Sequence, residues 1–270
     1  MKTILITGTS SGIGRGTAQY FWERGWNVIA TMRSPEKEME FIQLERMLVT
    51  RLDVVRKETI EASIAEGIRQ FGKIDVLLNN AGYAAIGAFE AATDEQVRNQ
   101  FDVNVFGVLQ TTQAILPHFR MNGEGTIINV SSVGGRVAFP LLSLYHASKW
   151  AIEGFSESLF YELAAQNIKV KVIEPGNVAT DFTGRSLDLL SDPSLNAYAA
   201  YSEAVLQKQM ASFETNVSTP ELIAETIYEA ATDASSRFRY LSGADAHFLM
   251  NLRSKASEEE FMAGITQQFS

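Results

Sequence analysis

Near its start the chain reads Ile4-Leu5-Ile6-Thr7-Gly8-Thr9-Ser10-Ser11-Gly12-Ile13-Gly14, an apolar run followed directly by a glycine-rich turn. An apolar run this short, ended by a turn, is typical of a buried strand in a parallel sheet. Residues 17–24 then follow a helical pattern that stops at Gly25. A strand, a glycine turn and a helix in this order are what a phosphate-binding loop needs. Glycines let backbone N–H groups approach a phosphate, and the helix N-terminus adds positive potential.

The glycine spacing in this turn is Gly-x-x-x-Gly-x-Gly, which differs from the G-x-G-x-x-G fingerprint of dinucleotide-binding loops. A turn that merely joins the strand to the helix is the alternative interpretation. The surrounding strand and helix favour a cofactor-binding loop.

A second strand is predicted over residues 27–32 and ends in Arg33. In dinucleotide-binding folds an acid at this strand end binds the 2′-hydroxyl of NAD, whereas an arginine accommodates the 2′-phosphate of NADP. Ser11 offers a hydroxyl partner, and no acid occurs after Arg33 before Glu36. We therefore expect NADP(H) to be preferred over NAD(H). The alternative is that Arg33 is a solvated surface residue.

Strands and helices alternate along most of the chain. A capping box at Thr93-Asp94-Glu95-Gln96 marks the start of one helix. Further strands are predicted at residues 47–52, 74–78, 126–130, 168–173 and 237–241, and helices at residues 56–71, at 93–117, around residues 145–149 and from Pro220. The alternation predicts an α/β fold with a doubly wound parallel sheet, a Rossmann fold, in a single domain over residues 1–270. The charged tail from Ser254 is expected to be a solvated helix or a frayed end.

The composition bounds the partners. A net charge of −9 argues against nucleic acid or an anionic membrane surface, since both need basic patches. The absence of cysteine excludes disulfides and thiolate metal sites, and the three histidines show no metal-site spacing. The sequence contains no apolar run of about 18 residues that could span a membrane and no targeting signal, so we expect a cytoplasmic protein.

Several small and polar residues fall where predicted strands end. They are Gly8 to Gly14, Arg33, Asp53, Asn80 to Gly82, Ser132 and Pro175 to Thr180. In open parallel sheets, ligands bind beyond the carboxyl ends of the strands. Tyr145 and Lys149 lie on the helix that follows the fifth strand and reach the same edge. Four residues apart, they share one helix face, and the ammonium is expected to lower the pKa of the phenol.

These motifs together resemble the short-chain dehydrogenase/reductase family in its short single-domain branch. The matching residues are Thr7-Gly8-x-x-x-Gly12-Ile13-Gly14, Asn79-Asn80-Ala81-Gly82, Asn104, Ser132, Tyr145-x-x-x-Lys149 and Pro175-Gly176. They run in order from residue 4 to about 180. The segment Ala30-Thr31-Met32-Arg33 also resembles NADP-preferring hydroxysteroid and retinol-type members.

The resemblance implies four catalytic residues. Tyr145 would be the general acid in carbonyl reduction and the base in alcohol oxidation. Lys149 would hold the nicotinamide ribose, and Ser132 would bond the substrate carbonyl and stabilise the developing oxyanion. Asn104 would anchor a water that relays protons to Lys149. His146 points away from the face of Tyr145 and is predicted to be a packing or surface residue.

The resemblance also implies a cofactor site and no metal. Asp53 and Val54 would face the adenine, and the residues after the sixth strand would cover the nicotinamide and pyrophosphate. The predicted cofactor-binding residues are Gly8, Ser10, Ser11, Gly12, Ile13, Gly14, Arg33, Asp53, Val54, Asn80, Ala81, Gly82, Tyr145, Lys149, Pro175, Gly176, Val178 and Thr180.

Residues 181–219 match the family's helical substrate lid. Their apolar and aromatic content suggests a small hydrophobic carbonyl or alcohol substrate, such as a steroid, retinoid, fatty-chain or aryl ketone. The bland alternative is that these side chains only pack on the domain. Family members commonly pair through the helices that begin near Thr93 and Ser143, so the resemblance suggests a homodimer or homotetramer.

Three other functions compete with an NADP(H)-dependent carbonyl reductase or alcohol dehydrogenase. A 3-oxoacyl-carrier-protein reductase would need a basic patch for its acidic carrier. The lid instead offers Arg185 and Lys208 against Asp181, Asp188, Asp192 and Glu203. A non-catalytic NADP-binding sensor would have no need of a proton donor such as Tyr145. Sugar-nucleotide epimerases share the Tyr-x-x-x-Lys spacing but usually have longer chains.

Overall fold

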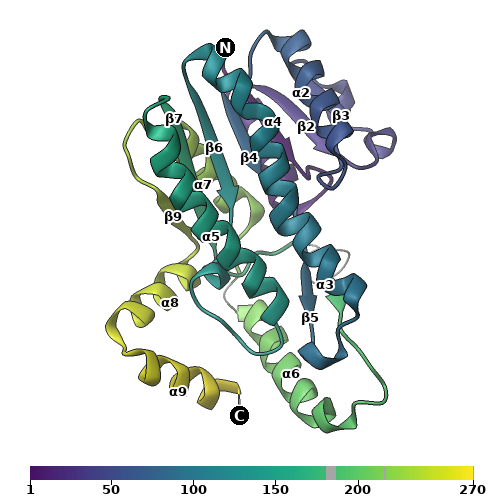
Figure 1. The fold of residues 1–270 in the computed structure, drawn as a ribbon, viewed down its shortest axis with the longest axis vertical. Coiled ribbons are helices and arrows are strands. Elements are labelled where there is room, and N and C mark those ends of the chain that lie inside the picture. The colour runs from purple at the N-terminus through teal and green to yellow at the C-terminus, as the bar shows by residue number, and fades with distance from the viewer. Residues whose placement is uncertain (181–186, 216, 270) are drawn as a thin grey trace.

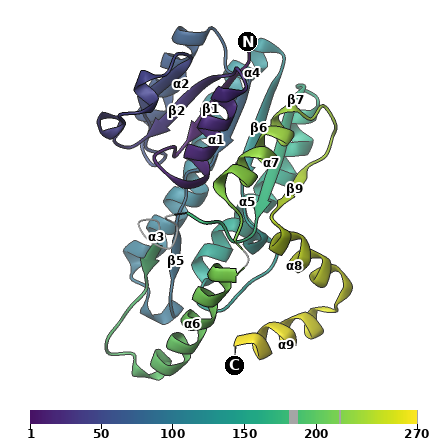
Figure 2. The same ribbon diagram turned by 180° about the vertical axis from the view of Figure 1, so that it is seen from behind.

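A parallel sheet forms the centre of the molecule, which we describe from a computed structural model over residues 1–180, 187–215 and 217–269. In this part of the chain, seven strands pair in the order β3-β2-β1-β4-β6-β7-β9 (Figures 1 and 2). They are β1 (Thr3–Thr7), β2 (Asn27–Met32), β3 (Met47–Arg51), β4 (Val76–Asn79), β6 (Gly125–Val130), β7 (Ile168–Pro175) and β9 (Arg239–Ser242). All the pairs are parallel. The strand order reverses between β1 and β4, which confirms the predicted doubly wound fold.

Helices cover both faces of this sheet because successive side chains of each strand point to opposite sides. Ile4 and Ile6 of β1 pack in one apolar cluster with Phe21, and Leu5 packs in the opposite cluster with Phe119. The first face is covered by α1 (Gly12–Glu23) and α7 (Pro220–Thr232), and the second by α2 (Lys57–Phe71), α4 (Gly107–Asn122) and α5 (Ser143–Ala164) (Figures 1 and 2). Each buried aliphatic or aromatic side chain contributes roughly 1.5–3 kcal/mol.

A second group of elements lies beyond one end of the sheet (Figure 1). It contains α3 (Asp94–Phe101), the short strands β5 (Ala84–Ile86) and β8 (Leu187–Leu189), and the helices α6 (Ala199–Thr215), α8 (Ala244–Lys255) and α9 (Glu258–Phe269). β5 and β8 form a parallel pair in which Ala84 is opposite Leu187. Single 3₁₀ turns lie at Pro35–Lys37, Phe41–Gln43, Phe89–Ala91, Val133–Gly135 and Asn196–Tyr198. Of the predicted lid, residues 181–186 and 216 lie outside the described residues.

The helix predicted over residues 93–117 is wrong in two respects. It is divided by a π-helical turn, Asp102–Phe106, that separates α3 from α4. It also continues past Pro117 to Asn122. Phe119 is fully buried, and His118 accepts a hydrogen bond from the backbone of Ile74 at 3.0 Å. These tertiary contacts outweigh the loss of one backbone hydrogen bond at the proline.

The start of α1 and the C-terminal tail also differ from the sequence-based expectation. α1 begins at Gly12, five residues earlier than predicted, so the glycine turn forms the first turn of the helix. The tail forms the helix α9, as one of the two expectations had it, but this helix is not fully solvated, since Phe261 and Phe269 are 7% and 6% exposed. Among the helices in the described ranges, none is both long and apolar enough to cross a bilayer.

Candidate active site

The glycine turn is shaped to approach a ligand with its backbone. Gly8 and Gly12 have φ angles of +75° and +56°, the left-handed region that glycine adopts without strain. A Cβ atom at Gly14 would lie 2.1 Å from the carbonyl oxygen of Gly8, so the turn closes tightly on itself. The N-terminus of α1 starts at Gly12 and directs free N–H groups and positive potential toward the same space.

Asn80 fixes this turn to the end of β4. Its side-chain Nδ2 donates to the carbonyl oxygens of Thr7 and Gly8 at 2.9 and 3.0 Å. The Thr7 hydroxyl in turn accepts from the backbone N–H groups of Asn80 and Ala81. The Asn80 amide is therefore used to join β1 to β4 at the point where the strand order reverses.

A cavity of about 1370 Å³ extends from the glycine turn along the carboxyl ends of the strands. All the residues predicted for a cofactor lie on its walls, and so does Ser132, which was predicted as a catalytic residue. The cofactor set is Gly8, Ser10, Ser11, Gly12, Ile13, Gly14, Arg33, Asp53, Val54, Asn80, Ala81, Gly82, Tyr145, Lys149, Pro175, Gly176, Val178 and Thr180. A cavity of this size, cradled by glycines at one end, fits a dinucleotide in an extended form.

Ser132, Tyr145 and Lys149 lie together in the middle of the cavity wall. Ser132 is the N-cap of the 3₁₀ turn after β6, where its hydroxyl accepts from the Gly134 N–H at 3.0 Å. The same side chain is hydrogen-bonded to the side chain of Tyr145. Lys149 is 8% exposed, and its Nζ donates to the carbonyl oxygen of Val130 at 2.9 Å.

The pKa values of Tyr145 and Lys149 differ from the sequence-based expectation. Burial raises the pKa of Tyr145 above its ordinary value, and the hydrogen bond to Ser132 opposes that effect. The expectation that Lys149 would leave this tyrosine with a lowered pKa is therefore wrong, because burial has the larger effect. Burial also lowers the pKa of Lys149 to about 8, and the nearby carboxylate of Glu153 opposes that shift. The lysine Nζ lies 5.7 Å from the centre of the Tyr145 ring.

Asn104 does not line the cavity and lies behind it in the π-helical turn. It is 2% exposed. Its amide brackets Tyr83, accepting from the backbone N–H at 3.1 Å and donating to the carbonyl oxygen at 2.9 Å. Nδ2 also donates to the Ser148 hydroxyl at 3.2 Å. The side chain thus joins α5 to the segment after β4, and a role in a proton relay stays a prediction.

Arg33 is exposed at the far end of the cavity, beside the glycine turn. The other arginine of this region, Arg15, is already paired. It contacts Glu38 and Glu40 at 2.7 and 2.6 Å and lies over the Phe41 ring. An anionic group bound next to Ser11 would therefore meet Arg33 rather than Arg15.

Sequence reasoning missed the walls that the C-terminal helices supply. Phe248, Leu249 and Leu252 of α8 and Ile265, Gln268 and Phe269 of α9 line the cavity. From α6 and the loop before α5 come Leu206, Gln209, Met210, Phe139 and Leu142. Phe261, Ile265 and Phe269 recur every four residues, and this amphipathic spacing was the available signal.

His146 also borders the cavity, although both its ring nitrogens are hydrogen-bonded to backbone groups. Nδ1 lies 2.8 Å from the Gly134 carbonyl oxygen, and Nε2 accepts from the Phe139 N–H at 2.9 Å. Burial lowers the pKa of this histidine, so it is neutral at pH 7. The ring thus holds the loop after Ser132 in place. Within the described ranges, no cluster of His, Asp and Glu side chains could hold a metal ion.

Comparison with known proteins agrees with this arrangement. The sequence profile of the short chain dehydrogenase family matches residues 2–188. The chain is 42% identical over 239 residues to an uncharacterised oxidoreductase of Schizosaccharomyces pombe, covering 88% of this chain and 99% of the relative. It is 43% identical over 182 residues to a 3-ketodihydrosphingosine reductase of Bacteroides thetaiotaomicron, covering 67% and 66% of the two chains.

Solved structures share the fold over nearly the whole chain. A short-chain dehydrogenase from Streptomyces avermitilis is 33% identical and superimposes with a TM-score of 0.83, covering 98% of both chains. One from Burkholderia cenocepacia, solved in complex with NADP, is 23% identical with a TM-score of 0.77, covering 98% of this chain and 99% of its own. The chain belongs to the short-chain dehydrogenase family and is an oxidoreductase, as its motifs predicted.

Proposed function

We propose that this protein is an NADP(H)-dependent oxidoreductase that interconverts a hydrophobic ketone or aldehyde and the corresponding alcohol. The observation that carries this proposal is the meeting of Ser132, Tyr145 and Lys149 on the wall of one cavity whose far end is the glycine turn. The bound nicotinamide supplies the hydride in reduction and accepts it in oxidation. The experiment that tests the proposal is a panel of ketones, aldehydes and hydroxysteroids, followed by NADPH absorbance with NADH in parallel.

Ser132, Tyr145 and Lys149 would each have a separate role in the reaction. The Ser132 hydroxyl would bond the substrate oxygen and stabilise the negative charge that develops there in reduction. Tyr145 would donate its phenolic proton to that oxygen, or accept it in the reverse direction. Lys149 is charged at neutral pH, and its ammonium would favour the phenolate in the transition state while it holds the ribose hydroxyls.

The apolar walls beyond Tyr145 support a hydrophobic substrate. Side chains from α6, α8 and α9, together with Phe139 and Leu142, line the part of the cavity away from the glycine turn. A relative 43% identical to this chain is a 3-ketodihydrosphingosine reductase, which fits a ketone with a long apolar chain. Asp188 also lines the cavity, and a carboxylate there disfavours the acidic carrier that a 3-oxoacyl-carrier-protein reductase must bind.

A non-catalytic NADP-binding sensor is the second candidate. The hydrogen-bonded Ser132 and Tyr145 weigh against it, because binding a cofactor requires no proton donor beside the substrate cavity. Turnover of any ketone in the panel excludes the sensor. NADPH binding without turnover of any compound would favour it.

We also propose that the protein forms a homodimer or homotetramer through α4 and α5. Large apolar side chains are exposed along these helices and the turn before α4: Phe106, Met121, Trp150 and Tyr161, with exposed fractions of 51%, 79%, 53% and 67%. Exposed apolar groups on neighbouring helices are typical of an interface between subunits.

Substitution of Arg33 by Asp is expected to change the cofactor preference. The ratio of kcat/KM for NADPH to that for NADH should fall by roughly 10–100-fold, because a charge-assisted hydrogen bond to the 2′-phosphate is worth about 1.5–3 kcal/mol. Arg51→Asp is the matched control. Arg51 lies at the end of the neighbouring strand β3, pairs with Glu36 at 2.9 Å and does not line the cavity. An unchanged ratio in Arg33→Asp would contradict the NADP(H) assignment.

Substitution of Phe269 by Ala is expected to weaken binding of long apolar substrates. KM for a long-chain ketone should rise about tenfold, equivalent to about 1.4 kcal/mol, because a large aromatic wall is removed. KM for a short ketone that reaches only Ser132 and Tyr145 should stay unchanged. Met262→Ala on the same helix is the control, since Met262 is 61% exposed. Equal changes for long and short ketones would show that α9 only supports the fold.

A further inference from the structure

A cluster of five charged side chains, two of them buried, lies next to the candidate active site. Arg239 of β9 is its centre and contacts three carboxylates. Its Nε is 3.0 Å from Glu153 of α5 and 3.3 Å from Glu174 of β7, while Nη2 is 2.7 Å from Glu157. Arg136, on the turn after Ser132, reaches Glu174 at 3.5 Å.

Two of these carboxylates are removed from water and close to each other. The side chains of Glu153 and Glu174 are 7% and 0% exposed, whereas that of Glu157 is 47% exposed. Both buried groups approach the same guanidinium nitrogen, so they compete for one positive charge. Burial and the neighbouring Glu153 raise the pKa of Glu174 to about 7. Near neutral pH, a proton on Glu174 thus removes its competition with Glu153 for Arg239.

The cluster joins the segments that carry the candidate catalytic groups. Glu153 follows Lys149 by one helical turn, and Glu174 directly precedes Pro175, whose carbonyl oxygen lies 3.5 Å from the Ser132 hydroxyl. A Cβ atom at Gly135 would lie 2.9 Å from Cγ of Glu153 and 3.2 Å from the carbonyl oxygen of Lys149. The turn after Ser132 therefore rests on this part of α5, with no room for a side chain between them.

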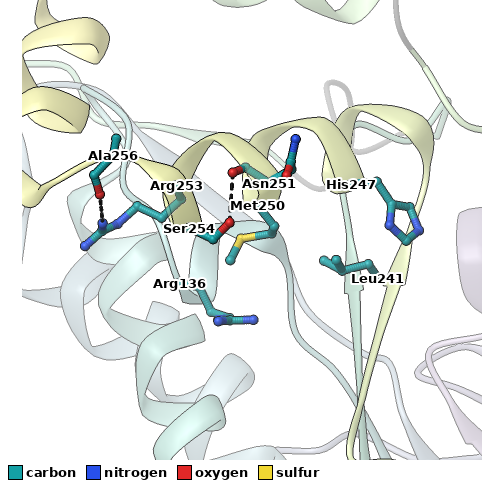
Figure 3. A pocket seen from close by; sticks show the side chains of 8 residues that line it. All are labelled: Arg136, Leu241, His247, Met250, Asn251, Arg253, Ser254 and Ala256. Atoms are coloured by element: carbon teal, nitrogen blue, oxygen red, sulfur yellow. Dashed lines mark hydrogen bonds between the residues drawn. The ribbon is translucent and has the colours of Figure 1, made fainter.

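A smaller cavity of about 730 Å³ borders the outer side of the cluster (Figure 3). Arg136 lies on one side of it and α8 on the other, with Leu241 and Met250 between them (Figure 3). Arg253 of α8 donates to the Ala256 carbonyl oxygen at 3.5 Å (Figure 3). Arg136 lines this cavity with 41% of its side chain exposed, whereas Glu174, its partner in the cluster, is fully buried.

We propose that Glu153 is a positioning residue for the reaction, and that its buried carboxylate, oriented by Arg239, keeps the ammonium of Lys149 charged. This inference rests on the proposed function, since it concerns how Lys149 serves Tyr145. Glu174 is the second buried carboxyl group of the cluster. When it is protonated, it no longer competes with Glu153 for Arg239.

Lys149 and the charged groups of the cluster come from four parts of the fold. α5 contributes Lys149, Glu153 and Glu157, β7 contributes Glu174, β9 contributes Arg239, and the turn after Ser132 contributes Arg136. Lys149 loses its charge as the pH rises through about 8, because burial disfavours the ammonium. The negative charge of Glu153 opposes that loss. Removing the charge should let the lysine deprotonate at a lower pH.

The test compares Glu153→Gln with the wild-type protein over a range of pH. The basic limb of kcat/KM should move to lower pH by about one unit in Glu153→Gln, in line with the effect of one nearby opposite charge in a buried site. Glu153→Asp should restore part of the shift. Glu157→Gln is the matched control, because it contacts the same arginine from an exposed position two turns from Lys149. Its profile should coincide with that of the wild type.

A second readout separates this inference from the proposed function. Lysine labelled with ¹³C at Cε reports the titration of Lys149 by NMR, with the resonance assigned by its loss in Lys149→Arg. The Lys149 titration should move to lower pH in Glu153→Gln, whether or not a substrate is known. A lowered melting temperature with unchanged lysine titration and pH profile would overturn the inference and leave Glu153 a structural residue. Failure of the wild type to oxidise NADPH with any ketone would count against the proposed function alone.

Discussion

Tyr145→Phe should lower kcat for ketone reduction by about 10²–10⁴-fold, the range that general acid–base catalysis contributes. The substitution removes one oxygen atom and leaves the ring, so the packing of α5 is preserved. It also removes the hydrogen bond to Ser132 and the proton donor that we propose for the substrate oxygen. NADPH binding, measured by fluorescence, should change by less than about threefold, because Lys149, which we propose to hold the ribose, is unchanged.

Tyr83→Phe is the matched control for this experiment. Tyr83 is another tyrosine on the cavity wall, and burial together with the charge of Asp188 raises its pKa to about 12. It lies in the segment whose backbone is hydrogen-bonded to Asn104, and it makes no hydrogen bond to Ser132. Its kcat should stay within about threefold of the wild type. Near-normal NADPH oxidation by Tyr145→Phe would refute the role of the tyrosine as proton donor.

The second large effect is expected at the glycine turn. Gly14→Ala would place a Cβ atom 2.1 Å from the Gly8 carbonyl oxygen and 2.5 Å from Nδ2 of Asn80. Neither group can move freely, because Nδ2 holds the carbonyls of Thr7 and Gly8 at the junction of β1 and β4. We expect a destabilisation of about 1–3 kcal/mol or more from overpacking. The affinity for NADPH should fall at least about tenfold, because the turn must open.

Gly264→Ala provides the comparison for the glycine experiment. It makes the same change inside α9, where a Cβ atom would meet no atom within 4 Å apart from the backbone of its own helix. This variant should gain about 0.5–1 kcal/mol, because alanine restricts the unfolded chain more than glycine does. Thermal melts and NADPH titrations of both variants check the prediction. A Gly14→Ala protein with the melting temperature and NADPH affinity of the wild type would show that the turn has room that its geometry denies.

The sheet and the location of the site were predictable from local sequence. The strands carry short apolar runs such as Ile4 to Ile6, and the residues that follow them are small or polar. Since parallel strands end at one edge, positions as distant as Gly8, Ser132 and Pro175 had to converge. That reasoning depends on periodicity and strand direction alone, so it needs no knowledge of how the side chains pack.

The misplaced features depend on contacts between distant segments. Pro117 marks a helix end by its local chemistry, but burial of Phe119 keeps α4 continuous. The raised pKa of Tyr145 comes from burial, which the spacing to Lys149 does not reveal. The cavity walls from α8 and α9 depend on where the tail folds back, and no strand-end rule specifies that position.

The pairing of β5 with β8 affects the conformational entropy that is lost when a ligand binds. Residues 187–189 are held by the parallel ladder to Ala84–Ile86, and Gln96 Nε2 donates to Asp188 and to the Leu189 carbonyl oxygen at 2.9 and 3.2 Å. These residues line the cavity, so this part of the wall is ordered when the chain folds. A ligand that contacts it does not lose affinity to the entropy of ordering those residues at each encounter. This part of the wall is ordered before a ligand binds and adapts little to a ligand of the wrong shape. Selectivity at this wall therefore depends on the shape of the ligand.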